Sequence, residues 1–176
     1  MAMTKKVLCY MNQFFAGIGG EEQAHVPPST RPGAVGLASQ IQNLLGDNAR
    51  VAATIICGDS YYGEHIEEAR AECLRMIGEF KPDILFAGPA FNAGRYGVAC
   101  GDVCAAASKE LGIPAVTGMF KENPGVELYS PETFIVKTAD SARGMKDALG
   151  AMTGLALKLL EDAPLGSAEE EGYFSR

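Results

Sequence analysis

The fold of this chain is decided around one continuous stretch, Asp83-Ile84-Leu85-Phe86-Ala87-Gly88-Pro89-Ala90-Phe91-Asn92-Ala93-Gly94-Arg95-Tyr96-Gly97. Its first five residues are mostly apolar, as is typical of a buried strand. The glycines that follow permit backbone angles closed to other residues and let a ligand approach the main chain. Loops after parallel strands commonly carry the site of an α/β protein. We therefore expect a binding loop over 88–97, directly after a strand over 83–87.

Strand and helix patterns alternate on both sides of this stretch. Short apolar runs predict strands over 6–10, 51–57, 83–87, 115–119 and 133–137. Helical periodicity predicts helices after Pro32, over 64–80, from the 88–97 loop to Leu111, and over 145–159. The alternation predicts an α/β fold in three layers, αβα, with a mostly parallel five-stranded sheet. Flavodoxin-like and half-Rossmann layouts both fit, and the order of the strands is left open.

Two segments interrupt the alternation. Residues 12–33 are too long for an ordinary loop between a strand and a helix, whose median length is about 4–6 residues. Residues 162–176 are acidic and include three consecutive glutamates. We interpret 1–161 as a single α/β domain and 162–176 as an acidic exit linker or tail. A chain of 176 residues is long enough for one domain with a substantial core.

Composition narrows the class of partner. The net charge is −7 and no cluster of Lys and Arg occurs, which argues against nucleic acid or an anionic membrane surface. No apolar run approaches the ~20 residues that a membrane-spanning helix needs, and the N-terminus has no signal-peptide pattern. The five cysteines are odd in number and scattered, which argues against a disulfide framework. We expect a soluble, cytoplasmic protein that binds a small molecule.

The loop after the first strand contains Gly17-Ile18-Gly19-Gly20, which is similar to part of a dinucleotide-binding fingerprint. That fingerprint requires a further glycine where Glu22 stands, and Glu21 and Glu22 would repel a pyrophosphate. We therefore expect neither NAD nor FMN. The loop is interpreted instead as a flexible lid or a partner contact. Its candidate residues are Asn12, Gln13, Phe14, Phe15, Gly17, Gly19 and Gly20.

Two cysteines are candidates for a catalytic role. Cys100 lies near the start of a predicted helix, whose dipole lowers the pKa of a thiol there. Cys57 ends the second predicted strand, where a side chain can face a ligand crevice. Cys100 and Cys104 share a helix face and are a conceivable metal pair. The same face is apolar, however, so buried thiols are the favoured interpretation and no metal site is predicted.

The main indication of a binding site comes from three segments taken together, 57–59, 88–97 and 117–119. Each follows a predicted strand, so all three are expected at one edge of the sheet. Aromatic rings suit a substituted ammonium group, and Arg95 suits a carboxylate. The combination fits a small amino acid or betaine, although Arg95 also fits a solvated residue at a helix start. The candidate substrate-binding residues are Cys57, Gly58, Asp59, Ser60, Tyr61, Gly88, Phe91, Asn92, Arg95, Tyr96, Thr117, Gly118 and Met119.

A family resemblance is carried by residues 10–22 (YMNQFFAGIGGEE), 56–61 (ICGDSY), 87–101, 117–119 and 122–126 (ENPGV), and by 169–173 near the end. These stretches resemble the selenoprotein B subunit family of glycine/sarcosine/betaine reductase. The resemblance covers essentially the entire chain, and stretches of this length are specific.

The resemblance implies a part in an amino-acid reductase complex. In that family component B binds glycine, sarcosine or betaine. A pyruvoyl group on the other component B subunit captures the amine of glycine or sarcosine, and a selenocysteine helps to cleave the C–N bond. The product then passes to selenoprotein A. These groups and subunits are the implied cofactors and partners.

One departure from the family concerns the mechanism. Family members are expected to be more than twice as long, with the selenocysteine in a C-terminal half that has no counterpart here. We therefore expect an N-terminal domain, fragment or short form that holds no cofactor and contributes substrate and partner binding. The alternatives are a non-catalytic docking or structural domain of the complex and a standalone thiol enzyme that uses Cys57 or Cys100. A homo-oligomer is a further partner that the sequence leaves open. The sequence does not distinguish the three substrates.

Overall fold

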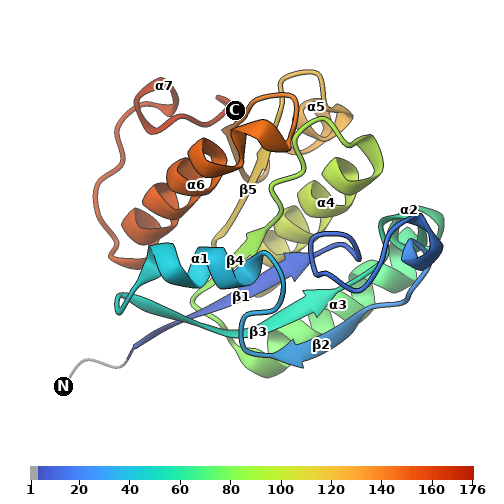
Figure 1. Ribbon diagram of the computed structural model, residues 1–176. Helices are drawn as coiled ribbons and strands as arrows, with labels where there is room; N and C mark the ends of the chain where they lie inside the picture. The colour runs from blue at the N-terminus through green and yellow to red at the C-terminus, as the bar shows by residue number, and fades with distance from the viewer. Residues whose placement is uncertain (1–3) are drawn as a thin grey trace.

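Six strands form one sheet, in the order β2-β3-β1-β4-β5-β6, in the computed structural model, which describes residues 4–176 (Figure 1). The strands are β1 Lys5–Met11, β2 Ser29–Pro32, β3 Ala49–Ile56, β4 Ile84–Ala87, β5 Ala115–Met119 and β6 Phe134–Lys137. All neighbours pair in parallel except β2 and β3. When β2 is left out and the parallel strands are numbered along the chain, their order in the sheet is the flavodoxin-like 2-1-3-4-5. The expected α/β fold is confirmed, and this order excludes the half-Rossmann layout.

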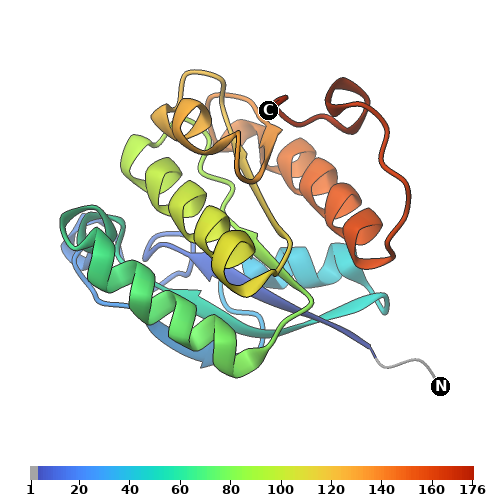
Figure 2. The same cartoon turned by 180° about the vertical axis from the view of Figure 1, so that it is seen from behind.

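Helices cover both faces of the sheet. They are α1 Ala38–Leu45, α2 Asp59–Glu64, α3 Ile66–Phe80, α4 Gly94–Leu111, α5 Pro124–Tyr129, α6 Met145–Leu160 and α7 Ala168–Glu171, with short 3-10 turns η1 Glu21–Gln23 and η2 Ala142–Gly144. Helices α1 and α6 lie on one face, and α3 and α4 lie on the other (Figure 1, Figure 2). No helix within residues 4–176 is both long and apolar enough to cross a membrane.

The core divides into two clusters because side chains alternate across a strand. On β1, Leu8 and Tyr10 pack toward α3 and α4, whereas Val7, Cys9 and Met11 pack toward α1 and α6. All four residues of β4 are buried. Covering on both faces explains why the strands read as continuous apolar runs in the sequence instead of an alternating pattern.

The structure contains one strand and three short helices that the sequence pattern did not predict, namely β2, α2, α5 and α7. The segment 12–33 was expected to be loop throughout, but it contains β2, which makes the sheet six-stranded. Every residue of β2 is exposed, and Pro32 is tolerated because an edge strand does not need its N–H for a neighbour. The expected helix over 64–80 is α3, which begins at Ile66, and the short helix α2 precedes it, with His65 between the two.

The acidic segment 162–176 lies against the domain. The Phe174 N–H donates to the carbonyl of Ile135 at 2.9 Å, and the Lys137 N–H donates to the carbonyl of Gly172 at 2.9 Å. The Lys158 ammonium lies 2.7 Å from the Glu171 carboxylate. This segment therefore borders the outer edge of β6 and is remote from the loops after β1 and β3.

Candidate functional site

A pocket of about 760 Å³ opens at the carboxyl edge of the sheet. It is lined by Asn12, Gln13, Phe14, Phe15, Gly20, Glu21, Asp59, Ala93, Gly94, Arg95 and Tyr96. The segments after β1 and β4 form its two main walls. These strands are neighbours in the sheet, and the helices that follow them, α1 and α4, lie on opposite faces. The pocket thus occupies the topological switch point, where open α/β sheets bind ligands.

One wall of the pocket is aromatic. The ring of Phe15 stacks on Tyr96 with centroids 5.8 Å apart and packs edge-to-face on Phe14 at 5.3 Å. Tyr96 is fully buried, whereas 64% of Phe14 is exposed. The three rings therefore run from the core to the surface and give the pocket an apolar side at its solvent end.

The opposite side carries two carboxylates around one guanidinium. Arg95 Nη2 donates to Glu21 Oε1 at 2.7 Å and lies 3.3 Å from Asp59 Oδ1, which is an ion pair without hydrogen-bond geometry. The bond to Glu21 and the charge of Asp59 raise the pKa of Arg95. The sequence analysis identified Arg95 and Asp59 but used Glu21 only as an argument against a pyrophosphate. Glu21 is 74 residues from Arg95 in the chain, so no local pattern signals their pairing.

Asp59 is fixed by hydrogen bonds from the residues that follow β1. Its Oδ2 accepts a hydrogen bond from Asn12 Nδ2 at 3.1 Å, and its N–H donates to Gln13 Oε1 at 3.4 Å. Its side chain is 8% exposed. The residues after β1, predicted as a lid, and the start of α2, predicted as substrate-binding, are therefore parts of one hydrogen-bonded wall.

The N-terminus of α4 also faces the pocket. Residues 93–96 line it, and the N-cap residue Ala93 supplies no side-chain hydrogen bond to the first turn. The first N–H groups of a helix have no partner within the helix, and the helix dipole places partial positive charge there. Together with Arg95, this end of α4 is suited to a carboxylate.

The structure brings only part of the predicted site residues to the pocket. Among them Asn12, Gln13, Phe14, Phe15, Gly20, Asp59, Arg95 and Tyr96 line it. The other predicted residues lie outside its lining: Gly17, Gly19, Cys57, Gly58, Ser60, Tyr61, Gly88, Phe91, Asn92, Thr117, Gly118 and Met119. Several of these support the pocket from behind.

The end of β5 supports the 88–97 loop. The Ala90 N–H donates to the carbonyl of Gly118 at 2.8 Å, and the Phe120 N–H donates to the carbonyl of Phe91 at 2.9 Å. Asn123, which the sequence analysis did not identify, adds two hydrogen bonds from Nδ2 to the carbonyls of Phe91 and Ala93, at 2.9 and 3.1 Å. It is 2% exposed and also caps α5. Asn123 therefore holds the segment that leads into the pocket wall.

The start of α2 anchors the far end of the lid segment. The Gly58 N–H donates to the carbonyl of Val26 at 2.9 Å, and the N–H groups of Ser60 and Tyr61 both donate to the carbonyl of Ala24 at 3.0 Å. These contacts use backbone groups only. They determine where the chain re-enters the fold after η1, and so they set the position of Glu21.

Both candidate thiols are buried. Burial raises the pKa of Cys57 to about 12. Burial also raises the pKa of Cys100, so the loss of solvation outweighs the dipole at the start of α4. Each thiol is therefore protonated at neutral pH, and the geometry provides neither with an activated form.

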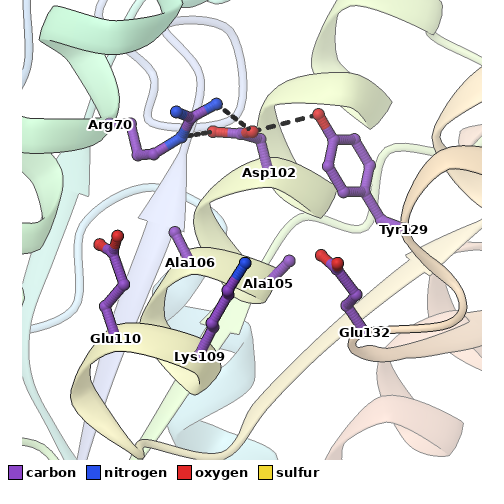
Figure 3. Close-up of a pocket in the computed structure, with 8 residues that line it drawn as sticks. All are labelled: Arg70, Asp102, Ala105, Ala106, Lys109, Glu110, Tyr129 and Glu132. Atoms are coloured by element: carbon purple, nitrogen blue, oxygen red, sulfur yellow. Dashed lines mark hydrogen bonds and ion pairs between the residues drawn. The ribbon is translucent and has the colours of Figure 1, made fainter.

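A second hollow, of about 240 Å³, lies over α3, α4 and α5 (Figure 3). Asp102 is its buried member, and its carboxylate accepts two hydrogen bonds from Arg70, from Nε at 2.9 Å and Nη2 at 2.8 Å. It also accepts from Tyr62 Oη at 2.5 Å and Tyr129 Oη at 3.1 Å. Every strong acceptor position of the carboxylate is thus engaged, which indicates a structural role for Asp102.

Comparison with known proteins finds close sequence relatives. Residues 4–176 match the family described as glycine/sarcosine/betaine reductase selenoprotein B. The chain is 52% identical over 171 residues to the glycine reductase complex component B subunit gamma of Carboxydothermus hydrogenoformans, which covers 97% of this chain and 39% of that relative. No solved structure matches.

Two relatives from Peptoclostridium acidaminophilum bear other substrate names. The sarcosine reductase complex component B subunit beta is 51% identical over 96% of this chain and 38% of the relative. The betaine reductase complex component B subunit beta is 39% identical over 98% of this chain and 39% of the relative. The chain therefore spans about two fifths of the length of these relatives.

Proposed function

Since this chain belongs to the glycine/sarcosine/betaine reductase selenoprotein B family, we propose that it contributes substrate and partner binding to component B of such a reductase. The pocket at the switch point is the proposed substrate site. The ligand class is a small amino acid or betaine, which carries a carboxylate and an ammonium group a few ångströms apart.

The contact that carries this proposal is Arg95 at the start of α4. A guanidinium and a helix N-terminus act together on the same carboxylate, and charge-assisted hydrogen bonds of this kind are stronger than neutral ones. Asp59, Glu21 and the aromatic wall provide negative charge and ring faces for an ammonium group. The pocket volume leaves room for a small zwitterion and for a group that approaches from another subunit.

The relatives favour an amine substrate. The proteins named for glycine and sarcosine are 52% and 51% identical to this chain, whereas the one named for betaine is 39% identical. The sequence contains no selenocysteine, and all five cysteines are buried. We therefore assign the selenium and the pyruvoyl group of the family to other parts of the complex, with binding and orientation of substrate left to this chain. A cytoplasmic location stays a prediction.

Substrate binding is tested by the change Arg95→Ala. Because it removes a charged donor, we expect the affinity for glycine or sarcosine to fall about 10- to 100-fold, which corresponds to about 1.5–3 kcal/mol. Isothermal titration calorimetry on the chain, alone and with the other component B subunit, measures this. The matched control is Arg75→Ala, which removes an exposed arginine of α3 paired only with Glu72 and Glu79. Equal affinities for the parent chain and Arg95→Ala would refute the assignment.

Partner binding is tested at Phe14. An aromatic ring that is 64% exposed beside a pocket is suited to a contact with another subunit. We expect Phe14→Ser to weaken assembly with the pyruvoyl-bearing subunit at least about tenfold, since aromatic side chains at interface centres commonly contribute more than 1 kcal/mol. Sedimentation or surface plasmon resonance gives the affinity. Leu44→Ser in α1, outside the pocket lining, is the control for an exposed apolar residue. Assembly unchanged by Phe14→Ser would leave the loop without a docking role.

A further inference from the structure

The guanidinium of Arg95 is already occupied in this structure. Both of its contacts, to Glu21 Oε1 and to Asp59 Oδ1, use the same nitrogen, Nη2. A guanidinium can donate paired hydrogen bonds to a carboxylate along two of its edges, Nε with Nη2 and Nη1 with Nη2. Nη2 supplies one N–H to each edge, and Glu21 already accepts a hydrogen bond from it. A ligand carboxylate that binds along the edge used by Glu21 must therefore displace Glu21, and along either edge it meets the negative charge of Glu21 and Asp59 beside Nη2.

The two acidic side chains are held very differently. Asp59 is 8% exposed and is fixed by the hydrogen bond from Asn12. Glu21 is 77% exposed, and Arg95 is its single side-chain partner among residues 4–176. An ion pair on the surface contributes little because water solvates both charges when the pair opens. Glu21 is therefore the side chain that leaves.

Glu21 also lies on a short segment between two backbone anchors. It begins η1, which follows Gly19 and Gly20 and ends before Ala24. Backbone hydrogen bonds anchor the chain on both sides, from Ile18 to Gln13 before η1 and from Ser60 and Tyr61 to Ala24 after it. Between these anchors, the Glu21–Arg95 pair is the side-chain contact that ties η1 to the start of α4.

We propose that Glu21 is an internal competitor for the ligand carboxylate at Arg95, so that ligand binding exchanges one carboxylate for another and releases η1 from α4. This inference rests on the proposed function of the pocket. The exchange keeps the charge at Arg95 balanced in both states. It makes Glu21 a determinant of affinity, because a ligand carboxylate that takes its place must first open the Glu21–Arg95 pair.

The experiment compares Glu21→Ala with Glu22→Ala by calorimetry with glycine, and with acetate as a probe that has a carboxylate and no amine. We expect Glu21→Ala to bind both up to about fivefold more tightly, the factor that an exposed ion pair of up to about 1 kcal/mol represents. Glu22→Ala is the matched control because it removes the same charge from the same turn. Its carboxylate accepts from the Gly20 N–H and does not touch Arg95. We expect its affinities to equal those of the parent chain.

Hydrogen exchange provides a second measurement. Saturating glycine is expected to speed exchange of the amides of residues 20–23 in the parent chain, and these amides are expected to exchange rapidly in Glu21→Ala without ligand. Binding that neither variant alters, or that both tighten equally, overturns the competitor role and leaves the proposed pocket intact. Absence of binding to all three chains would instead count against the proposed function itself.

Discussion

Replacing Asp102 by alanine is expected to lower the free energy of unfolding by about 3 kcal/mol, at the lower end of the range for a broken buried ion pair. Asp102 is 5% exposed, and its carboxylate accepts hydrogen bonds from Arg70 and Tyr129 (Figure 3) and a further one from Tyr62. These donors come from α3, α2 and α5, so one side chain of α4 joins three other helices. Its removal leaves the buried hydroxyl of Tyr62 without an acceptor.

The lower end of the range applies because Arg70 is 34% exposed and can be solvated by water once its partner is gone. Urea unfolding followed by circular dichroism measures the change. Glu72→Ala serves as the control, since Glu72 pairs with Arg75 on the exposed side of α3 and its loss should cost far less. Equal midpoints for Asp102→Ala and the parent chain would show that the cluster does not stabilise the fold.

Replacing Gly58 by alanine is expected to destabilise the chain by about 1–3 kcal/mol, the usual cost of overpacking. A Cβ atom there would overlap the carbonyl of Ala24 and lie 2.8 Å from the Val26 nitrogen. These are backbone atoms, which cannot rotate away as a flexible side chain can. The Gly58 N–H also donates to the carbonyl of Val26, so the strain falls directly on a hydrogen bond that anchors the lid segment.

The same change should weaken ligand binding. Gly58 directly precedes Asp59, whose side chain lines the pocket, so the strain also displaces the carboxylate proposed to attract the ammonium group of the ligand. The control is Gly63→Ala in α2, where an added Cβ meets no heavy atom within 4 Å and alanine favours the helix. Urea unfolding and calorimetry applied to both variants test the expectation. A Gly58→Ala chain with parent stability and affinity would mean that the segment 24–26 shifts without consequence.

Local patterns in the sequence were sufficient for most of the fold. The apolar runs predicted all five parallel strands, because a strand covered on both faces needs apolar side chains throughout. Gly112, in the left-handed conformation at φ 66°, ends α4 where the sequence placed the end. The edge strand β2 escaped prediction because its residues are exposed and carry no such pattern.

The sequence predicted several residues of the site but not the contacts between them, and the two depend on different physical causes. Asp59, Arg95, Tyr96 and the residues after β1 follow strands, so parallel topology alone brings them to one edge. The partners of those residues depend on strand order and on the direction of each side chain, which local periodicity does not encode. Glu21 with Arg95 and Asn123 with Phe91 meet only in the folded chain.

The sequence by itself thus determined the α/β class and the strand ends, because these depend on spacing along the chain, and it indicated the family through the resemblance of long stretches of residues. Only the tertiary structure decided which charges meet. It placed the guanidinium of Arg95 between an exposed and a buried carboxylate and buried the two candidate thiols, whose pKa values it raises. Ion pairing and desolvation act through distances of a few ångströms, and those distances exist only after distant segments have packed together.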